Sequence, residues 1–387
     1  MQPRSRAARD ALAALAARGW SVAGVHDAAL IERWCAAWTG SALDRAYAAA
    51  IAAHHSAPRP FEQVGVLLPG NVAIAAAQQI GEALLAGVHR VAVGVPDAQG
   101  RGRRTLTAAE DFVSALGRVD PDVAARVRID PLPAADASSA RSWLRPLQAL
   151  VAAGSDAALA RWRGWWDETG PGRAARWQGH RVSVALWSPA EPGGLAAHAL
   201  AIAEDALIGD GAGCMSPRLL VLQPPPETDR TIVDAALDAL GAACAQVGAR
   251  FPARGRSTAS AAAHRLHIDE LALSHELRSP GAATALLVGD VPAPPAPPPQ
   301  AATDALFSLG PGHRALVVWC AVDDGWLAQL RPLRPWLGTL AVAGPPGAWP
   351  ARGRAAGFVR VVHAGMAQAP GPAEVQDGAT PIRVFWA

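Results

Sequence analysis

The chain has 387 residues, of which 51% are hydrophobic and 18% charged, and its formal net charge is +2. This length is enough for two domains with a substantial core, and a nearly neutral charge argues against nucleic acid as the main partner. The sequence contains no lysine, which excludes Schiff-base and P-loop mechanisms that require one. No apolar run reaches the length of about 18 residues that a membrane span needs. We expect a cytoplasmic protein, because the N-terminus lacks the cleavage site of a signal peptide.

Residues 5–55 show helical spacing of apolar side chains, with Gly19 and Gly40 as the expected helix ends. From residue 63 onward, strand-like and helix-like segments alternate. Strands are expected at 63–70, 90–95, 126–133, 149–154 and 180–188. Helices are expected at 71–87, 107–119, 138–148 and 155–166. This alternation predicts right-handed crossovers and a mostly parallel sheet covered on both faces.

The second half repeats the alternation after a loop at 209–216. Its expected strands are 217–223, 283–289, 314–322, 337–344, 357–362 and 381–387, and its expected helices are 226–249 and about 323–333. The proline-rich stretch "VPAPPAPPPQ" (291–300) is expected to be an extended surface connection. The sequence therefore predicts a second α/β layer set and two domains.

The cysteines and histidines do not form a recognisable metal site. Cys35, Cys214, Cys244 and Cys320 are widely spaced and form no CxxC pair, so we expect reduced thiols without a disulfide framework or a zinc site. The pair His264 and His267 has no third ligand at a suitable spacing. No metal is expected.

Cys214 differs from the other cysteines because it lies in the loop "DGAGCMSPRLL" (210–220), between a helix-like and a strand-like segment. A thiol becomes a nucleophile only as the thiolate, which needs exposure and local positive potential. A glycine-flanked turn supplies unpaired N–H groups and lets a substrate approach. From these residues alone, a small buried thiol is an equally good interpretation.

Four segments in the same order resemble the LuxC-type long-chain acyl-CoA reductases, a branch of the aldehyde dehydrogenase superfamily. They are "LLPGNVAIAA" (67–76), "AAGSDAALARW" (152–162), "AIAEDALIGDGAGCMSPRLLVLQ" (201–223) and "GFVRVVHAGMAQAPGPAEVQDG" (357–378). The resemblance spans residues 60–387 and implies an aldehyde-dehydrogenase-like α/β fold. Its expected parts are a Rossmann-type cofactor domain with the N-terminal helices (1–200), an α/β catalytic domain (201–360) and a closing C-terminal segment (361–387).

The resemblance also implies roles for individual residues. Cys214 would be the nucleophile that takes the acyl group, and the Asn71 side chain would bind the oxyanion together with the Cys214 backbone N–H. Gly154 and Ser155 would begin a helix that approaches the cofactor pyrophosphate. Glu204 and Asp205 match acidic positions of the family, and solvated charges at a helix end are an equally good interpretation of them.

The expected cofactor site departs from the superfamily pattern at one position. A lysine usually ends the second strand, where this chain has Val93 or Gly94. The following turn, "DAQGRGRR", carries Arg101, Arg103 and Arg104, which we expect to bind a 2′-phosphate and so to select NADPH. A solvated basic turn is the alternative interpretation, and NADH stays open as the cofactor.

The resemblance implies NAD(P)H-dependent reduction of a fatty acyl thioester, carried on CoA or acyl carrier protein, to the aldehyde through a cysteine thioester. A homo-oligomer and an acyl-transferring partner enzyme are the expected protein partners. Two alternatives stay open: a catalytically degenerate relative that binds acyl chains or partners, and a cysteine-dependent acyltransferase without hydride transfer. Only the reductase must bind a nicotinamide cofactor.

Overall fold

The computed structural model divides the chain into two compact units, Met1–His180 with Ala369–Ala387, and Arg181–Gln368. It describes every residue except 23, 55–58, 71, 101, 134–135, 191–192, 212, 255–257, 282–283, 291–313, 346, 369, 373 and 375–380. The proline-rich stretch, Asn71 and Arg101 therefore lie outside the described residues.

Unit 1 is built on a parallel sheet of five strands in the order β3-β2-β1-β4-β5. The strands are β1 (Gln63–Leu67), β2 (Arg90–Pro96), β3 (Val127–Leu132), β4 (Ala149–Ala153) and β5 (Ala174–Gln178). The strand order reverses between β1 and β4. In open sheets of this kind, ligands bind outside the carboxyl ends of the strands at that reversal.

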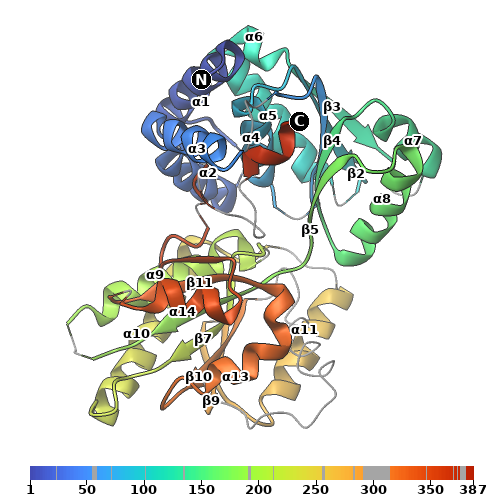
Figure 1. Cartoon of the computed structure of the whole chain (residues 1–387). Coiled ribbons are helices and arrows are strands. Elements are labelled where there is room, and N and C mark those ends of the chain that lie inside the picture. The colour runs from blue at the N-terminus through green and yellow to red at the C-terminus, as the bar shows by residue number, and fades with distance from the viewer. Residues whose placement is uncertain are drawn as a thin grey trace. The chain divides into compact units, whose positions relative to one another are not determined.

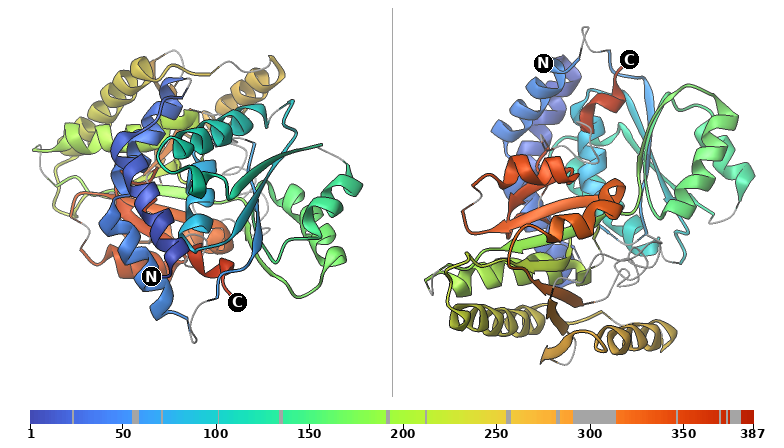
Figure 2. Two further views of the ribbon diagram at one scale, coloured as in Figure 1. Left: turned by 90° about the horizontal axis from the view of Figure 1, so that it is seen from above. Right: turned by 60° about the horizontal axis from the view of Figure 1, so that its bottom comes forward.

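Helices cover both faces of this sheet, because alternate strand residues enter different cores. Val64, Val66 and Val151 pack with α4 (Ala75–Leu85) and α5 (Arg103–Gly117). Leu150 and Ala152 pack with α7 (Ala137–Leu144) and α8 (Asp156–Thr169) on the opposite face. The N-terminal helices α1 (Pro3–Arg18), α2 (Val25–Ala37) and α3 (Gly40–Ala52) lie side by side over α4 and α5 (Figures 1 and 2).

Unit 2 is built on a sheet of seven strands in the order β12-β11-β6-β7-β10-β9-β8. All neighbours are parallel except β8 and β9. The strands are β6 (Val182–Trp187), β7 (Pro217–Leu222), β8 (Glu276–Gly281), β9 (Thr284–Asp290), β10 (Ala315–Cys320), β11 (Leu337–Ala343) and β12 (Arg360–His363).

The helices of unit 2 fall into two groups. Leu219 and Val221 of β7 share a core with side chains of α11 (Thr258–Leu271) and α13 (Trp326–Leu330), and α14 (Trp349–Ala356) packs against it. Helices α9 (Leu195–Leu207) and α10 (Arg230–Arg250) pack against each other and against the sheet. Among the described residues, α10 is the one helix long and apolar enough to cross a membrane by length and composition. Its residues Leu240, Cys244 and Val247 are buried within the unit.

Most of the expected elements are present, and the differences have physical causes. The strand expected at 381–387 is wrong: Pro381–Phe385 forms a short 3-10 helix, η3, which buries Ile382 and Phe385 in the core of unit 1. Gly40 does not end a helix; it begins α3, whose N-terminus is capped by Thr39. The strands β5 and β8 and the helices α6 (Pro121–Ala124), α11 and α14 are not expected from the sequence. The segment of β8 has no apolar alternation and contains Pro280, so pairing with β9 at the sheet edge defines it.

The unit boundaries differ from the expected domain boundaries of 200 and 360. Unit 1 ends at His180, because β6 pairs with β7 and β11 of the second sheet. The C-terminal residues 369–387 group with unit 1. Trp386 is part of that core, and its indole N–H donates to the Ala86 carbonyl at 2.9 Å.

Candidate active site

Cys214 lies in a tight turn directly before β7. The Ser216 N–H donates to the Gly213 carbonyl at 3.1 Å, and the Cys214 side chain is exposed. The chain enters this turn through Gly209, Asp210 and Gly211, which have φ angles of 73°, 64° and 66°. Glycine adopts this left-handed region readily, whereas at Asp210 it costs free energy. The buried Asp210 carboxylate lies 3.5 Å from Nε of the buried Arg314, an ion pair that opposes this cost.

Two side chains from distant segments fix the backbone of the turn. Ser183 Oγ of β6 donates to the Cys214 carbonyl at 2.7 Å and accepts from the Thr339 N–H at 3.0 Å. The Gln368 side-chain amide donates to Ser216 Oγ and to the Asp205 carbonyl. The position of the thiol therefore depends on a network of buried hydrogen bonds as well as on the local turn.

Asp205 and Glu204 have different surroundings although they are adjacent. The Asp205 carboxylate is fully buried and accepts from the N–H groups of Gly365 at 2.6 Å and Ala367 at 3.2 Å. Arg360 donates to the Met366 and Ala367 carbonyls in the same loop. Glu204 is half-buried and lies 3.7 Å from the exposed Arg250. Asp205 thus joins α9 to the 365–367 loop, and Glu204 makes a surface ion pair.

The other three cysteines are poor nucleophiles. Burial raises the pKa of Cys35 to about 11 and that of Cys244 to about 12, and it also raises the pKa of Cys320. Cys244 is buried and Cys35 and Cys320 are half-buried, whereas Cys214 is exposed. Since the thiolate is the reactive form, Cys214 is the candidate nucleophile among the four.

Gly154 and Ser155 lie where β4 passes into α8, beside the reversal of strand order. Ser155 is the N-cap of α8, and its hydroxyl oxygen accepts from the Ala158 N–H at 3.3 Å. The Asp156 carboxylate accepts from the His180 N–H at 2.9 Å. The N–H groups of the first helical turn remain suited to an anionic group at the carboxyl edge of the sheet. The binding of a dinucleotide pyrophosphate by Gly154 and Ser155 stays a prediction.

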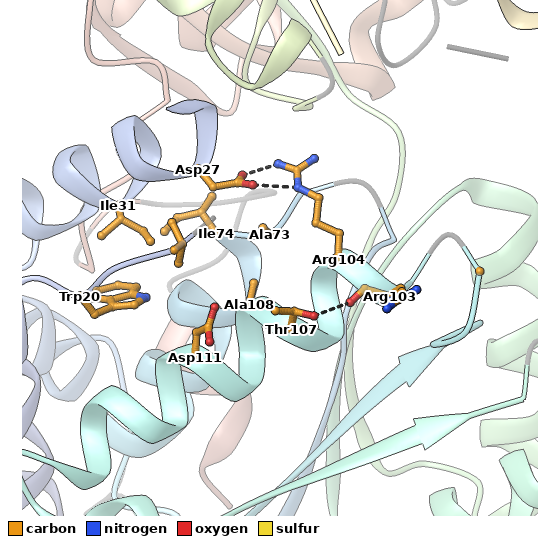
Figure 3. A pocket seen from close by; sticks show the side chains of 12 residues that line it. Trp20, Asp27, Ile31, Ala73, Ile74, Arg103, Arg104, Thr107, Ala108 and Asp111 are labelled. Carbon is orange, nitrogen blue, oxygen red and sulfur yellow. Dashed lines mark hydrogen bonds and ion pairs between the residues drawn. The ribbon is translucent and has the colours of Figure 1, made fainter. Parts of the chain in front are cut away.

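Arg103 and Arg104 both line a pocket of about 470 Å³ in unit 1 (Figure 3). Arg104 makes a two-point ion pair with Asp27 of α2, with Nε 2.8 Å from Oδ2. Arg103 is exposed, and its carbonyl accepts from the Thr107 hydroxyl at 3.2 Å. The remaining lining residues are Trp20, Val22, Ile31, Ala73, Ile74, Gly100, Ala108 and Asp111. The pocket has mostly apolar walls and two charges of each sign.

Four residues of the site are not expected from the sequence: Ser183, Gln368, Arg218 and Arg314. Arg218 is the second residue of β7 and Arg314 immediately precedes β10, and both are at least nine-tenths buried. For Arg218 and Arg314 the sequence does offer a signal, which is an arginine at the start of an otherwise apolar strand. Ser183 and Gln368 left no such signal, because their partners are distant in sequence. Within the described part of the chain, no three His, Cys, Asp or Glu side chains gather as a metal site.

Comparison with solved structures gives the fold. The chain is similar to an oxidoreductase from Marinobacter aquaeolei, with a TM-score of 0.63 and 14% identity over 99% of this chain and 83% of that chain. An NAD-dependent aldehyde dehydrogenase from Sinorhizobium meliloti has a TM-score of 0.63 and 15% identity over 99% and 80% of the two chains. A 1-pyrroline-5-carboxylate dehydrogenase from Thermus with bound NAD has a TM-score of 0.60 and 16% identity over the same shares. The expected aldehyde-dehydrogenase-like fold is confirmed.

Comparison with curated protein sequences gave no match. A family model described as acyl-CoA reductase (LuxC) matches residues 47–289, which is more than half of the chain and includes Cys214. The resemblance found in the sequence is therefore confirmed, and the chain belongs to the acyl-CoA reductase (LuxC) family.

Proposed function

We propose that this protein reduces a fatty acyl thioester, on CoA or acyl carrier protein, to the aldehyde through a thioester on Cys214. The observation that carries the proposal is the exposed thiol in a fixed turn of a chain that matches the acyl-CoA reductase family. The aldehyde-dehydrogenase-like fold supports it, because this fold combines a dinucleotide-binding sheet with a second α/β unit.

In the first step, Sγ of Cys214 attacks the carbonyl carbon of the substrate thioester. A new carbon–sulfur bond forms, the bond to the carrier sulfur breaks, and the carrier leaves as its thiol after taking up one proton. Charge develops on the carbonyl oxygen during the attack. The Cys214 N–H and the Asn71 side chain are the proposed donors to that oxygen, the latter from the family resemblance.

A bound nicotinamide supplies the hydride that reduces the acyl group. On the protein side, the carbon–sulfur bond to Cys214 then breaks, the aldehyde leaves and the sulfur returns to the thiolate. The turn must hold Cys214 in one place through both steps, and the bonds from Ser183 and Gln368 do so. A displacement of a catalytic group by about 1 Å can lower the rate of the catalysed reaction about a hundredfold.

For the cofactor, we propose that Gly154 and Ser155 bind the pyrophosphate and that Arg103, with Arg101, binds a 2′-phosphate. Arg104 is a weaker candidate than its neighbours, because Asp27 already holds its guanidinium. NADPH is the proposed cofactor. A preference for NADH, which has no 2′-phosphate, would show that these arginines do not select the cofactor.

The test is a pair of measurements on the wild-type protein and on Cys214→Ala, with Cys320→Ala as the matched control. Mass spectrometry after incubation with a fatty acyl-CoA should show an acyl group on Cys214 of the wild type and the control. Both should then oxidise NADPH and release aldehyde, and Cys214→Ala should do neither. Acylation without NADPH oxidation would favour an acyltransferase. Absence of both across a range of acyl-CoA chain lengths would favour a degenerate relative.

A further inference from the structure

Arg218 is a buried residue at the start of β7, four residues after Cys214. The turn closed by the Gly213–Ser216 hydrogen bond reverses the chain, so that β7 begins directly after the thiol. Leu219 and Val221 face the core that contains α11 and α13. Arg218 is the extra residue of a bulge at the start of β7, because Ser183 of β6 pairs with Pro217 and Val184 pairs with Leu219.

The Arg218 side chain is an unusual occupant of this position. The residue is 5% exposed, and Nη1 has no hydrogen-bond partner among the described residues. A guanidinium stays charged under nearly all conditions, and burying it without a complete set of hydrogen-bond partners is unfavourable. Arg360, which is buried to a similar degree, instead donates to two backbone carbonyls. The packing of unit 2 therefore does not by itself explain why a buried guanidinium occupies position 218.

Cys214 provides the negative partner. Burial lowers the pKa of Arg218, and the charge of the Cys214 sulfur acts in the opposite direction. An electrostatic interaction of this kind is mutual, so the guanidinium favours the thiolate to the same extent.

Other charged groups lie in the segments that join the turn, and each of them has an ionic or hydrogen-bond partner. Asp210 faces Arg314, and the Asp205 carboxylate is held by two backbone N–H groups. Nη1 of Arg360 lies 3.9 Å from Sδ of Met215. Glu204 and Arg250 form a separate surface pair on α9 and α10. The two buried carboxylates and three buried guanidiniums leave one positive charge in excess near the thiol.

We propose that the buried Arg218 is a positioning residue that holds Cys214 as a thiolate before substrate arrives. The thiol proton passes to water, and the sulfur remains as the anion opposite the guanidinium. Arg218 touches no substrate; it acts through Cys214. The consequence for catalysis rests on the proposed function, but the charge state of the sulfur does not.

The test measures alkylation of Cys214 by iodoacetamide as a function of pH, quantified for each cysteine by mass spectrometry. The wild-type midpoint is expected clearly below about 8.5, the value of an ordinary thiol. Arg218→Met should raise the midpoint by about one pH unit or more, a tenfold change in the thiolate at neutral pH. Arg218→Lys should keep most of the lowering, because it retains a positive charge. Arg250→Met, which removes an exposed arginine from the same unit, should leave the midpoint unchanged.

Cys244 serves as the internal control for folding, because it is buried on α10 and should stay unmodified while unit 2 is folded. A midpoint in Arg218→Met equal to that of the wild type, with Cys244 protected, would overturn the proposal. If Arg218→Met exposes Cys244, the proposal is judged from the alkylation midpoints of the wild type and of Arg218→Lys. A wild-type midpoint at or above about 8.5 would also overturn the proposal. Alkylation needs neither acyl-CoA nor NADPH. A low midpoint in a protein that no acyl-CoA acylates would thus refute the proposed function and leave this inference standing.

Discussion

Ser183 Oγ donates a hydrogen bond of 2.7 Å to the carbonyl oxygen of Cys214, although 31 positions separate the two residues. Ser183 Oγ also accepts a hydrogen bond of 3.0 Å from the N–H of Thr339 on β11. One buried hydroxyl thus connects the candidate nucleophile to two strands of the second sheet, β6 and β11. This connection makes Ser183 a sensitive position.

Ser183→Ala should destabilise unit 2 by about 1–3 kcal/mol, because the Thr339 N–H and the Cys214 carbonyl are left buried without this partner. Turnover should fall more than substrate affinity, since the cysteine turn loosens. Urea unfolding and steady-state kinetics check these effects. The matched control is Ser188→Ala, which removes an exposed hydroxyl that donates to the Gln223 carbonyl at 2.7 Å; it should change stability much less. Equal effects of the two substitutions would contradict a special role for Ser183.

Asp205→Ala should cost about 2–4 kcal/mol of unfolding free energy, because two N–H groups lose a charged acceptor in a fully buried place. Glu204→Ala should cost well under 1 kcal/mol, since its partner Arg250 is 65% exposed. Chemical denaturation of the two variants side by side measures the difference. A larger loss for Glu204→Ala would reverse the assignment of the anchoring role to Asp205.

Arg103→Ala should weaken NADPH binding by about 1.5–3 kcal/mol for each charged hydrogen bond lost, and leave NADH nearly unchanged. Arg104→Ala should instead lower stability by about 1–2 kcal/mol, because Asp27 keeps a poorly exposed carboxylate without its cation. Fluorescence titration with both cofactors and thermal unfolding separate these effects. If Arg103→Ala weakens both cofactors equally, this arginine does not bind the 2′-phosphate.

Asn71→Ala should lower turnover on the order of a hundredfold, the usual effect of losing one oxyanion donor, with little change in NADPH affinity. Asn71→Asp offers a stricter test, because it keeps the size of the side chain but removes the N–H donor. Single-turnover acylation of Cys214 measures the affected step directly. An acylation rate unchanged in both variants would remove Asn71 from the mechanism.

Unit 2 should lose stability as the pH rises above about 9, and Cys244 should contribute to that loss. Burial raises its pKa to about 12 in the folded protein, well above the value of about 8.5 of an ordinary thiol, so the unfolded chain releases this proton first. The stabilising effect of the neutral thiol is therefore complete below pH 9 and disappears between about 9 and 12. Cys244→Ala should flatten the dependence of unfolding free energy on pH in that range. An unchanged slope would show that other groups dominate the alkaline transition.

The sequence by itself determined the order of most strands and helices, because a period of two or of 3.6 residues is a local property of the chain. It also singled out Cys214, since glycines at 209, 211 and 213 predict a turn at one place. The resemblance to the acyl-CoA reductases rested on four short segments, and the family match confirms it.

Only the tertiary structure decided the rest, because the interactions concerned join distant segments. The strands β5 and β8 exist through pairing with β4 and β9, and the C-terminal residues become a short helix because Ile382 and Phe385 fill a core built from the first half of the chain. Gln368 reaches Ser216 across 152 positions, and Asp205 reaches Gly365 across 160. Arg218 can be read from the sequence, but its importance comes from its burial at the start of β7. No local sequence pattern specifies which groups a buried guanidinium will contact.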